Sequence, residues 1–352
     1  MFQIGIDTMI PTRNVEYPGN LVLLDGISGT GKTLLNGLVD LYEKNCLPSF
    51  NYTLEQLCIG DYLGFNRRDI TEIMLKLQID QLRYDQEIGR EVNFRPKDLS
   101  SVFRSSKKIE YIMKLFASDG CSAEKKLIDN PKNLVLITHQ LLRSSMILDE
   151  IYGASIIRLH AMRHPAYLFN HWVSCVDLVA KSVRDFSIWI ESFNSTSPWF
   201  LFNEIDLRDY ERLSHYDKAA VCVTNLSEAA LKFHLDLKLN SNYIVFDFEN
   251  FVLNPESYIE SLNEVFNENI SKKAYRYLSK EKVPRNHINA GRSRKIYRRY
   301  GSDKSTSIHS HKSNYNQTIE KISSNVSKKY LDRYFDVINE YEQEFGQWFN
   351  DS

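Results

Sequence analysis

Residues 21–35 read Leu-Val-Leu-Leu-Asp-Gly-Ile-Ser-Gly-Thr-Gly-Lys-Thr-Leu-Leu, and this stretch decides the fold class. Its first four residues form a short, continuous apolar run, which is typical of a parallel strand buried on both faces. The pattern Gly-x-x-x-x-Gly-Lys-Thr follows from Gly26 to Thr33, and from Thr33 to about Lys44 apolar residues recur at helical spacing. A strand, a glycine-rich loop and a helix in this order predict a phosphate-binding loop, or P-loop.

The residue types in this loop suit an anionic ligand. Glycines allow successive backbone N–H groups to turn towards one anion, and the helix N-terminus adds the positive end of its dipole. A lysine at this position neutralises charge on a terminal phosphate. We therefore predict that a phosphorylated nucleotide binds here, with contacts from Gly26, Ser28, Gly29, Thr30, Gly31, Lys32 and Thr33.

Three further apolar runs read as strands, and each ends in polar or charged residues. They are residues 134–137, followed by Thr138 and His139; residues 155–161, followed by Arg163 and Pro165; and residues 243–246, followed by Asp247. Helical patterns separate the strands, so the sequence predicts an α/β P-loop fold of three layers around a central, mostly parallel sheet. In such sheets ligands bind beyond the carboxyl ends of the strands.

We expect one domain that spans residues 1–352, with its core at 20–300. Residues 50–128 have a mostly helical period and form a predicted insertion. A stretch rich in Ser, Asn, His and Lys at 302–318 predicts a mobile loop, and aromatic residues at helical spacing predict an amphipathic helix at 320–350 that packs on the core.

Composition places the chain among ordinary globular proteins. It has 352 residues, of which 43% are hydrophobic and 25% charged, and a formal net charge of −1. This balance does not favour a generally basic nucleic-acid coat. The five cysteines show no Cys-x-x-Cys spacing, so we expect reduced, mostly buried thiols and no metal site. We see no signal peptide and no run of about 20 apolar residues, which favours a soluble, cytoplasmic protein.

Four segments, in chain order, resemble the sulfotransferases that use 3′-phosphoadenosine 5′-phosphosulfate, a family with the P-loop sheet architecture of nucleotide kinases. Residues 26–35 align without gaps on the family's phosphosulfate loop, Gly-x-Pro-(Lys/Arg)-Ser-Gly-Thr-Thr-Leu-Leu. Residues 136–139 are similar to a strand that ends in Lys-Thr-His. Residues 156–165 look like the strand that leads to Arg-x-Pro, and residues 243–256 are similar to the segment Tyr-Glu-Asp-Leu-x-x-(Asp/Asn)-Pro-Glu.

The resemblance implies transfer of a sulfuryl group from this donor to a hydroxyl or amine of an acceptor, a glycan or small molecule that variable loops such as 50–128 would select. His139 then stands at the catalytic base, which suits an imidazole because its charge changes near neutral pH. Arg163 stands at the arginine that binds the 3′-phosphate, and Lys32 would supply the cation beside the leaving phosphate. His171 replaces a serine that helps to hold the 3′-phosphate, and the late Arg-Lys-Gly loop is partly matched by Arg292, Arg294 and Lys295.

Two departures from the family pattern keep other functions open. Gly29 stands where the family has lysine or arginine, and Lys32 stands at its first threonine, so the intact Gly-Lys-Thr also fits an ATP- and magnesium-dependent small-molecule or sugar kinase. A kinase normally has a carboxylate at a neighbouring strand end. The strand at 134–137 has none there, which leaves Asp247 or Glu249.

A third hypothesis is a noncatalytic nucleotide-binding regulator. Residues 271–300 contain eleven lysines and arginines and one acid, Glu281. This run fits a solvated face, a cover over the nucleotide, or a contact with an anionic acceptor such as a polysaccharide. Few aromatic residues interrupt it, which argues against a stacking surface for nucleic acid.

Overall fold

The structure is a computed structural model, and it describes residues 11–98, 100–116, 120–181, 186–192, 195–201, 207–288 and 311–346. The chain divides into two compact units. The first comprises Met1–Leu24 and Asn36–Arg158, and the second comprises Asp25–Leu35 and Leu159–Ser352. The expectation of a single domain with its core at 20–300 stays a prediction.

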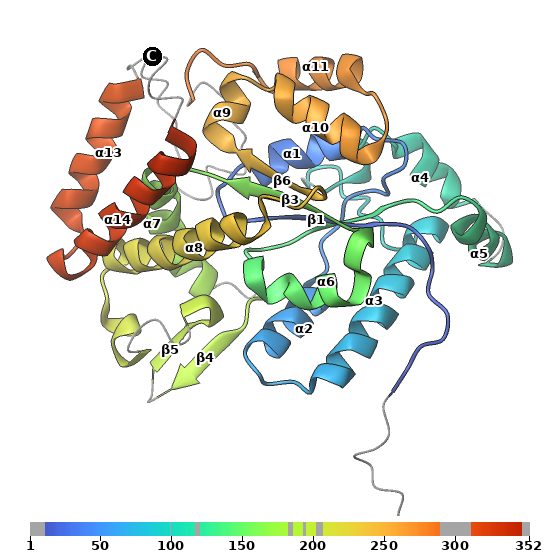
Figure 1. Ribbon diagram of the computed structural model, residues 1–352, viewed down its shortest axis with the longest axis horizontal. Coiled ribbons are helices and arrows are strands. Elements are labelled where there is room, and N and C mark those ends of the chain that lie inside the picture. The colour runs from blue at the N-terminus through green and yellow to red at the C-terminus, as the bar shows by residue number, and fades with distance from the viewer. Residues whose placement is uncertain are drawn as a thin grey trace, which may run out of the picture. The chain divides into compact units, whose positions relative to one another are not determined.

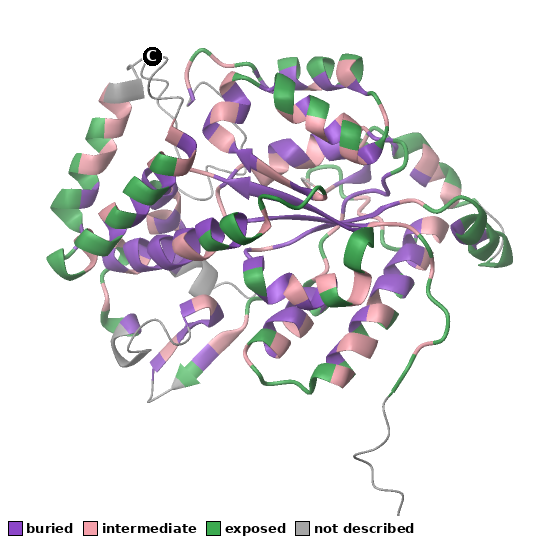
Figure 2. Ribbon diagram, viewed as in Figure 1, coloured by how far each residue is buried: buried purple, intermediate pink, exposed green. Residues whose placement is uncertain are grey.

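A central sheet has the strand order β2-β1-β3-β6 (Figure 1). Its strands are β1 (Leu21–Gly26), β2 (Leu134–Ile137), β3 (Ile156–Met162) and β6 (Tyr243–Asp247), which are the four predicted runs. β1 and β2 pair in parallel, with Leu21 opposite Leu134 and Leu24 opposite Ile137. Every residue of β1, β2 and β3 is buried, as the purple strands of Figure 2 show. The predicted α/β fold is therefore confirmed.

The first unit is mostly helical outside its strands, as predicted for residues 50–128. Its helices are α2 (Tyr52–Tyr62), α3 (Arg68–Ile88), α4 (Lys108–Lys114), α5 (Gly120–Asp129) and α6 (Ile147–Tyr152), with 3-10 turns at Val102–Arg104, Leu142–Met146 and Gly153–Ser155. Arg83, a buried residue of α3, links this helix to the segments that lead into β1 and β2. Its guanidinium donates to the carbonyls of Gly19, Asn20 and Lys132. These bonds compensate for the burial of a charged group.

The helix after the P-loop is shorter than predicted. α1 spans Lys32–Val39 and does not reach Lys44. The chain leaves the helix because tertiary partners take over its last groups: the Asn45 side chain donates to the Val39 carbonyl at 3.0 Å. The carboxylate of Asp40 accepts the Ser105 hydroxyl at 2.7 Å, which holds a distant loop against this turn.

The second unit contains the remaining helices and a small hairpin. The helices are α7 (Pro165–Lys181), α8 (His215–Leu237), α9 (Phe248–Leu253), α10 (Glu256–Phe266), α11 (Ser271–Lys280), α13 (His311–Asn325) and α14 (Lys328–Phe345). The antiparallel hairpin is β4 (Trp189–Ser192) with β5 (Ser195–Pro198), and 3-10 turns lie at Trp199–Leu201 and Leu207–Arg212. α8 packs against both α7 and α14.

The end of the chain corrects two predictions. Residues 311–318 belong to α13 and are not a loop, because tertiary contacts such as the hydrogen bond from the Tyr315 hydroxyl to Glu342 stabilise this polar stretch. Residues 302–310 and 347–350 lie outside the described residues. The single predicted helix is broken between α13 and α14, where the N–H and hydroxyl of Ser327 both donate to the carboxylate of Asp217, at 2.8 and 2.9 Å.

The apolar stripe of α14 packs inward as expected, with Tyr334, Val337, Ile338, Tyr341 and Phe345 buried. All five cysteines are free thiols, and only Cys121 among them is exposed. Among the helices that the structure describes, none is long and apolar enough to cross a membrane.

Candidate functional site

The P-loop has the backbone that its glycines predict. Gly26, Gly29 and Gly31 have φ angles of 145°, 99° and 91°, which L side chains rarely adopt. A Cβ at Gly31 would lie 2.5 Å from the Phe248 ring, and one at Gly29 would lie 2.8 Å from the His171 ring. No side chain fits at either position without movement of the neighbouring ring.

The ammonium group of Lys32 folds back over the loop. Its Nζ donates to the carbonyl of Gly26 and, at 3.3 Å, to that of Ile27. Lys32 is also the first residue of α1, so it places a positive charge at a helix N-terminus. Thr30 is buried and its hydroxyl donates to the Ile27 carbonyl at 2.8 Å, so this side chain holds the turn. Thr33 is half-buried in the first turn of α1.

One side chain just before α7 and two within this helix contact residues 28 and 29. Arg163 Nη1 donates to the Gly29 carbonyl at 2.9 Å, and Trp172 Nε1 donates to the Ser28 carbonyl at 3.1 Å. His171 Nε2 lies 3.1 Å from the Ser28 hydroxyl. Trp172 was missed from the sequence, where only its position next to His171 on a predicted helix could have drawn attention to it.

His171 is neutral at physiological pH. Burial, and then the positive charges of Arg163 and Lys32, lower the pKa of His171 to about 4. A neutral imidazole is a hydrogen-bond partner for the Ser28 hydroxyl rather than a cation for the ligand. The structure thus brings Arg163 and His171, both predicted from the resemblance, into contact with the P-loop itself.

Two buried acids lie behind Arg163. The Arg163 guanidinium stacks on the Phe248 ring at 4.7 Å, and its Nε lies 3.7 Å from Glu249 Oε1. Glu249 is fully buried, and its Oε2 accepts the His164 N–H at 3.1 Å. The Tyr341 hydroxyl of α14 donates to Asp247 at 2.7 Å.

These surroundings make the two acids structural. Burial, and then the charge of Asp247, raise the pKa of Glu249 to about 8, and burial also raises the pKa of Asp247. Asp247 additionally caps α9 by accepting the Glu249 N–H at 3.3 Å. Neither carboxyl is therefore placed as an exposed magnesium ligand, which was the role that a kinase would need from one of them.

The raised pKa of Glu249 predicts how stability depends on pH. A glutamate whose folded pKa is raised from 4.5 to about 8 binds more protons in the folded than in the unfolded state between these values, so its contribution to stability falls as pH rises through this window. In Glu249→Gln this loss is absent. We expect the melting temperature of Glu249→Gln, minus that of wild type, to increase by several degrees from pH 6 to 9. Scanning calorimetry measures it, with the exposed Glu256→Gln as the control, and a pH-independent difference would contradict the prediction.

His139 belongs to the first unit, where it follows β2. Its Nδ1 lies 3.1 Å from Glu55 Oε1, and its backbone N–H donates to Glu55 Oε2 at 2.9 Å. The rings of Phe50 and Tyr52 stack on the imidazole, with centroids 5.2 and 5.4 Å away. The His139 side chain is still 36% exposed. An imidazole held in this way can accept a proton from a bound molecule at its other nitrogen, Nε2.

The position of His139 follows from the strand pairing. The Thr138 N–H donates to the Leu24 carbonyl at 3.0 Å, which continues the β1–β2 ladder to the carboxyl end of both strands. Glu55, Phe50 and Tyr52 were missed from the sequence. They lie 84 or more residues before His139, in a stretch without a recognisable motif.

The remaining predicted residues, Arg292, Arg294 and Lys295, lie outside the described residues. The earlier part of the basic run forms α11, where Lys272, Lys273, Arg276 and Lys280 are exposed. α11 touches the P-loop helix through the Tyr277 hydroxyl, which donates to the Leu34 carbonyl at 3.1 Å.

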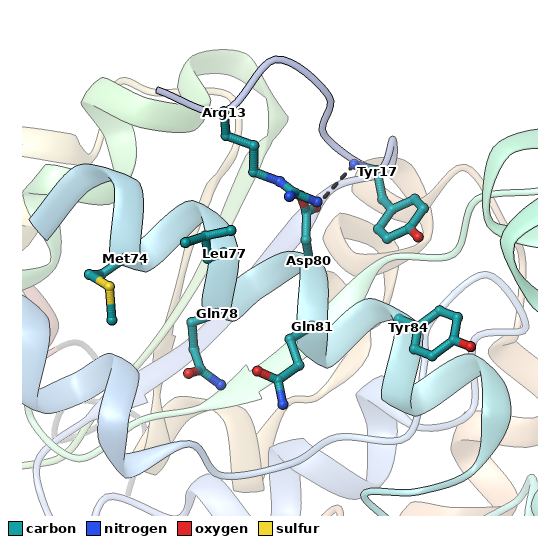
Figure 3. Close-up of a pocket in the computed structure, with 8 residues that line it drawn as sticks. All are labelled: Arg13, Tyr17, Met74, Leu77, Gln78, Asp80, Gln81 and Tyr84. Atoms are coloured by element: carbon teal, nitrogen blue, oxygen red, sulfur yellow. Dashed lines mark hydrogen bonds and ion pairs between the residues drawn. The ribbon is translucent and has the colours of Figure 1, made fainter. Parts of the chain in front are cut away.

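A surface hollow of about 540 Å³ lies in the first unit, away from these motifs in the sequence (Figure 3). In Figure 3 Arg13 and Tyr17 meet at Asp80 on α3: Arg13 Nε lies 2.5 Å from Asp80 Oδ2, and the Tyr17 N–H donates to Oδ1 at 3.0 Å. Both carboxylate oxygens are thus used to hold the segment 13–17 on α3. None of the predicted site residues lines the hollow.

Within the described ranges, no group of three or more His, Cys, Asp or Glu side chains is arranged to hold a metal ion. No model of a protein family matches the chain, and no curated protein matches it by sequence.

Among solved structures the chain is similar to several sulfotransferases. The sulfotransferase domain of the olefin synthase of Synechococcus PCC 7002 aligns with 91% of this chain and 100% of its own, with 10% identity and a TM-score of 0.39. The sulfotransferase domain of the curacin biosynthetic pathway aligns with 89% and 100%, with 12% identity and a TM-score of 0.38. Sulfotransferase STF1 from Mycobacterium tuberculosis H37Rv aligns with 80% and 76%, with 12% identity and a TM-score of 0.34. The chain is therefore similar to sulfotransferases of known structure at TM-scores below 0.5, and its function has to be argued from its own residues.

Proposed function

We propose that this protein transfers a sulfuryl group from 3′-phosphoadenosine 5′-phosphosulfate to a hydroxyl or amine of an acceptor, a glycan or a small molecule. The observation that carries the proposal is His139, a partly exposed imidazole that contacts a buried carboxylate through Nδ1. It stands directly after the strand next to β1, where a magnesium-dependent kinase would be expected to have an acid.

The reaction breaks the bond between sulfur and the bridging phosphate oxygen and forms a bond between sulfur and the acceptor oxygen or nitrogen. The proton of the acceptor passes to His139 Nε2, and adenosine 3′,5′-bisphosphate leaves. By analogy with phosphoryl transfer, positioning and charge stabilisation provide most of the rate enhancement. In this scheme Lys32 neutralises charge on the leaving phosphate, and the backbone N–H groups of residues 29–33 hold the phosphosulfate.

The alternative of an ATP-dependent kinase rests on the intact Gly-Lys-Thr of the loop. The burial of Asp247 and Glu249, and the raised pKa values that follow from it, argue against their use as magnesium ligands. A nucleotide-binding regulator would need the loop and the basic run but would have no use for a carboxylate-bound histidine.

Calorimetric titration of the full chain separates these functions. We expect adenosine 3′,5′-bisphosphate to bind without metal and ATP with magnesium to bind much more weakly. Binding of ATP with magnesium alone would refute sulfuryl transfer in favour of the kinase. If neither nucleotide bound, both enzyme functions would fail.

Arg163 is proposed to bind the 3′-phosphate while it holds the loop. We expect Arg163→Ala to weaken adenosine 3′,5′-bisphosphate by about 10- to 150-fold, because a charge-assisted hydrogen bond contributes about 1.5–3 kcal/mol. Adenosine 5′-phosphate lacks the 3′-phosphate and should lose much less. Both affinities can be measured by calorimetry.

The matched control for this prediction is Trp172→Phe. This change removes another side-chain hydrogen bond to the loop backbone, at Ser28, without removing a charge. It should weaken the two nucleotides equally. If Arg163→Ala also weakened them equally, Arg163 would only anchor the loop through Gly29 and would not bind the 3′-phosphate.

A further inference from the structure

The imidazole of His139 is held by side chains from one short segment at the start of α2. Asn51 caps this helix by accepting the Leu54 N–H at 2.8 Å, and Phe50, Tyr52 and Glu55 lie around this cap. The two aromatic rings are nearly parallel to the imidazole, at interplanar angles of 21° and 7°. They restrict the tilt of the imidazole plane, while Glu55 contacts the ring edge at Nδ1.

Both carboxylate oxygens of Glu55 contact His139. Oε2 takes the His139 backbone N–H at 2.9 Å, and Oε1 faces Nδ1 at 3.1 Å. The glutamate is only 4% exposed, whereas the His139 side chain is 36% exposed. An ionised carboxylate accepts hydrogen bonds but cannot donate one, so the nitrogen that faces it must carry the proton.

We propose that Glu55 is a positioning residue that fixes neutral His139 in the tautomer with its proton on Nδ1, which leaves the lone pair on Nε2. The use of this lone pair as the base for the acceptor proton rests on the proposed function. When Nε2 takes the proton, the carboxylate at Nδ1 stabilises the imidazolium that forms. The same division of roles operates between the Asp and His of a Ser-His-Asp triad.

Glutamine at position 55 is the decisive substitution. It preserves the shape of the side chain but has one acceptor oxygen in place of two, while His139 presents two N–H groups to this side chain. If the oxygen stays with the backbone N–H, the amide NH₂ faces Nδ1 and favours the tautomer with the proton on Nε2. That tautomer cannot accept a proton at Nε2, so Glu55→Gln should impair the base without removing it.

The tautomer can be measured without donor or acceptor. We label the full-length protein with ¹⁵N-histidine and assign His139 among the nine histidines by the spectrum of His139→Gln. In the neutral form of the ring, wild type should show Nδ1 protonated and Nε2 unprotonated. Glu55→Gln should shift the population towards the Nε2–H form, and Glu91→Gln, an exposed control with the same charge change, should not. If Glu55→Gln does not fold, the wild-type spectrum alone tests the proposal, because the Nε2–H tautomer in wild type would overturn it.

Turnover provides the second readout. With labelled donor and an accepted acceptor, Glu55→Gln should lower kcat by about 10²- to 10⁴-fold, the upper value being that of the corresponding change in a Ser-His-Asp triad. The affinity for adenosine 3′,5′-bisphosphate should stay within a few-fold. An unchanged kcat in a folded Glu55→Gln would overturn the positioning role. If wild type shows the expected tautomer but binds no bisphosphate, the proposed function fails. The role of Glu55 in fixing the tautomer of His139 then still holds.

Discussion

Replacing Lys32 by methionine is expected to lower the affinity for adenosine 3′,5′-bisphosphate by about 10- to 150-fold, which corresponds to the loss of one charge-assisted hydrogen bond of about 1.5–3 kcal/mol. Methionine has nearly the length of lysine and no charge, so the loop keeps its packing. The ammonium contacts the carbonyls of Gly26 and Ile27, and a phosphate would offer a stronger, charged partner. Calorimetric titration measures the change.

The control for this prediction is Lys44→Met, which removes the same charge from an exposed position after α1. It should leave the affinity unchanged, because exposed charges interact weakly over distance in salt. Melting temperatures of both variants show whether the loop is intact. If Lys32→Met binds the bisphosphate as tightly as wild type, Lys32 does not contact the donor and the proposed catalytic cation must be another residue.

Replacing His139 by alanine is expected to reduce turnover by about 10²- to 10⁴-fold, the usual contribution of a general base. The affinity for adenosine 3′,5′-bisphosphate should stay within a few-fold, because His139 is not among the residues predicted to bind the nucleotide. Transfer of the ³⁵S-labelled sulfuryl group from labelled donor to acceptors found in a screen of glycans and small molecules gives the rate. Calorimetry gives the affinity.

His215→Ala serves as the control, since His215 is an exposed histidine at the start of α8. Its turnover should equal that of wild type. A large loss of nucleotide affinity in His139→Ala, together with a lower melting temperature, would mark His139 as structural. In that case the bonds between His139 and Glu55 would serve the packing of α2 against β2.

Local sequence determined the framework of this protein. The four apolar runs became β1, β2, β3 and β6, and the glycine pattern became a loop with three positive φ angles. Both outcomes can be read from short stretches of sequence: a continuous apolar run is typical of a buried parallel strand, and only glycine easily adopts the backbone conformations of the loop. The resemblance to sulfotransferases also drew attention to Arg163 and His171, and both contact the loop in the structure. Their segment follows the end of β3, which lies next to β1 in the sheet.

Only the tertiary structure decided what surrounds the reactive groups. Glu55 and His139 are separated by 84 positions, and Tyr341 and Asp247 by 94, so no local period or spacing could indicate that they touch. The split of the last helix at Ser327 likewise depends on a carboxylate 110 residues away. The type of each secondary-structure element follows largely from neighbours in sequence, whereas its ends, its hydrogen-bond partners, its burial and the resulting pKa values follow from which distant segments pack together. For this chain, the P-loop could therefore be predicted from the sequence, but the carboxylate that orients His139 could not.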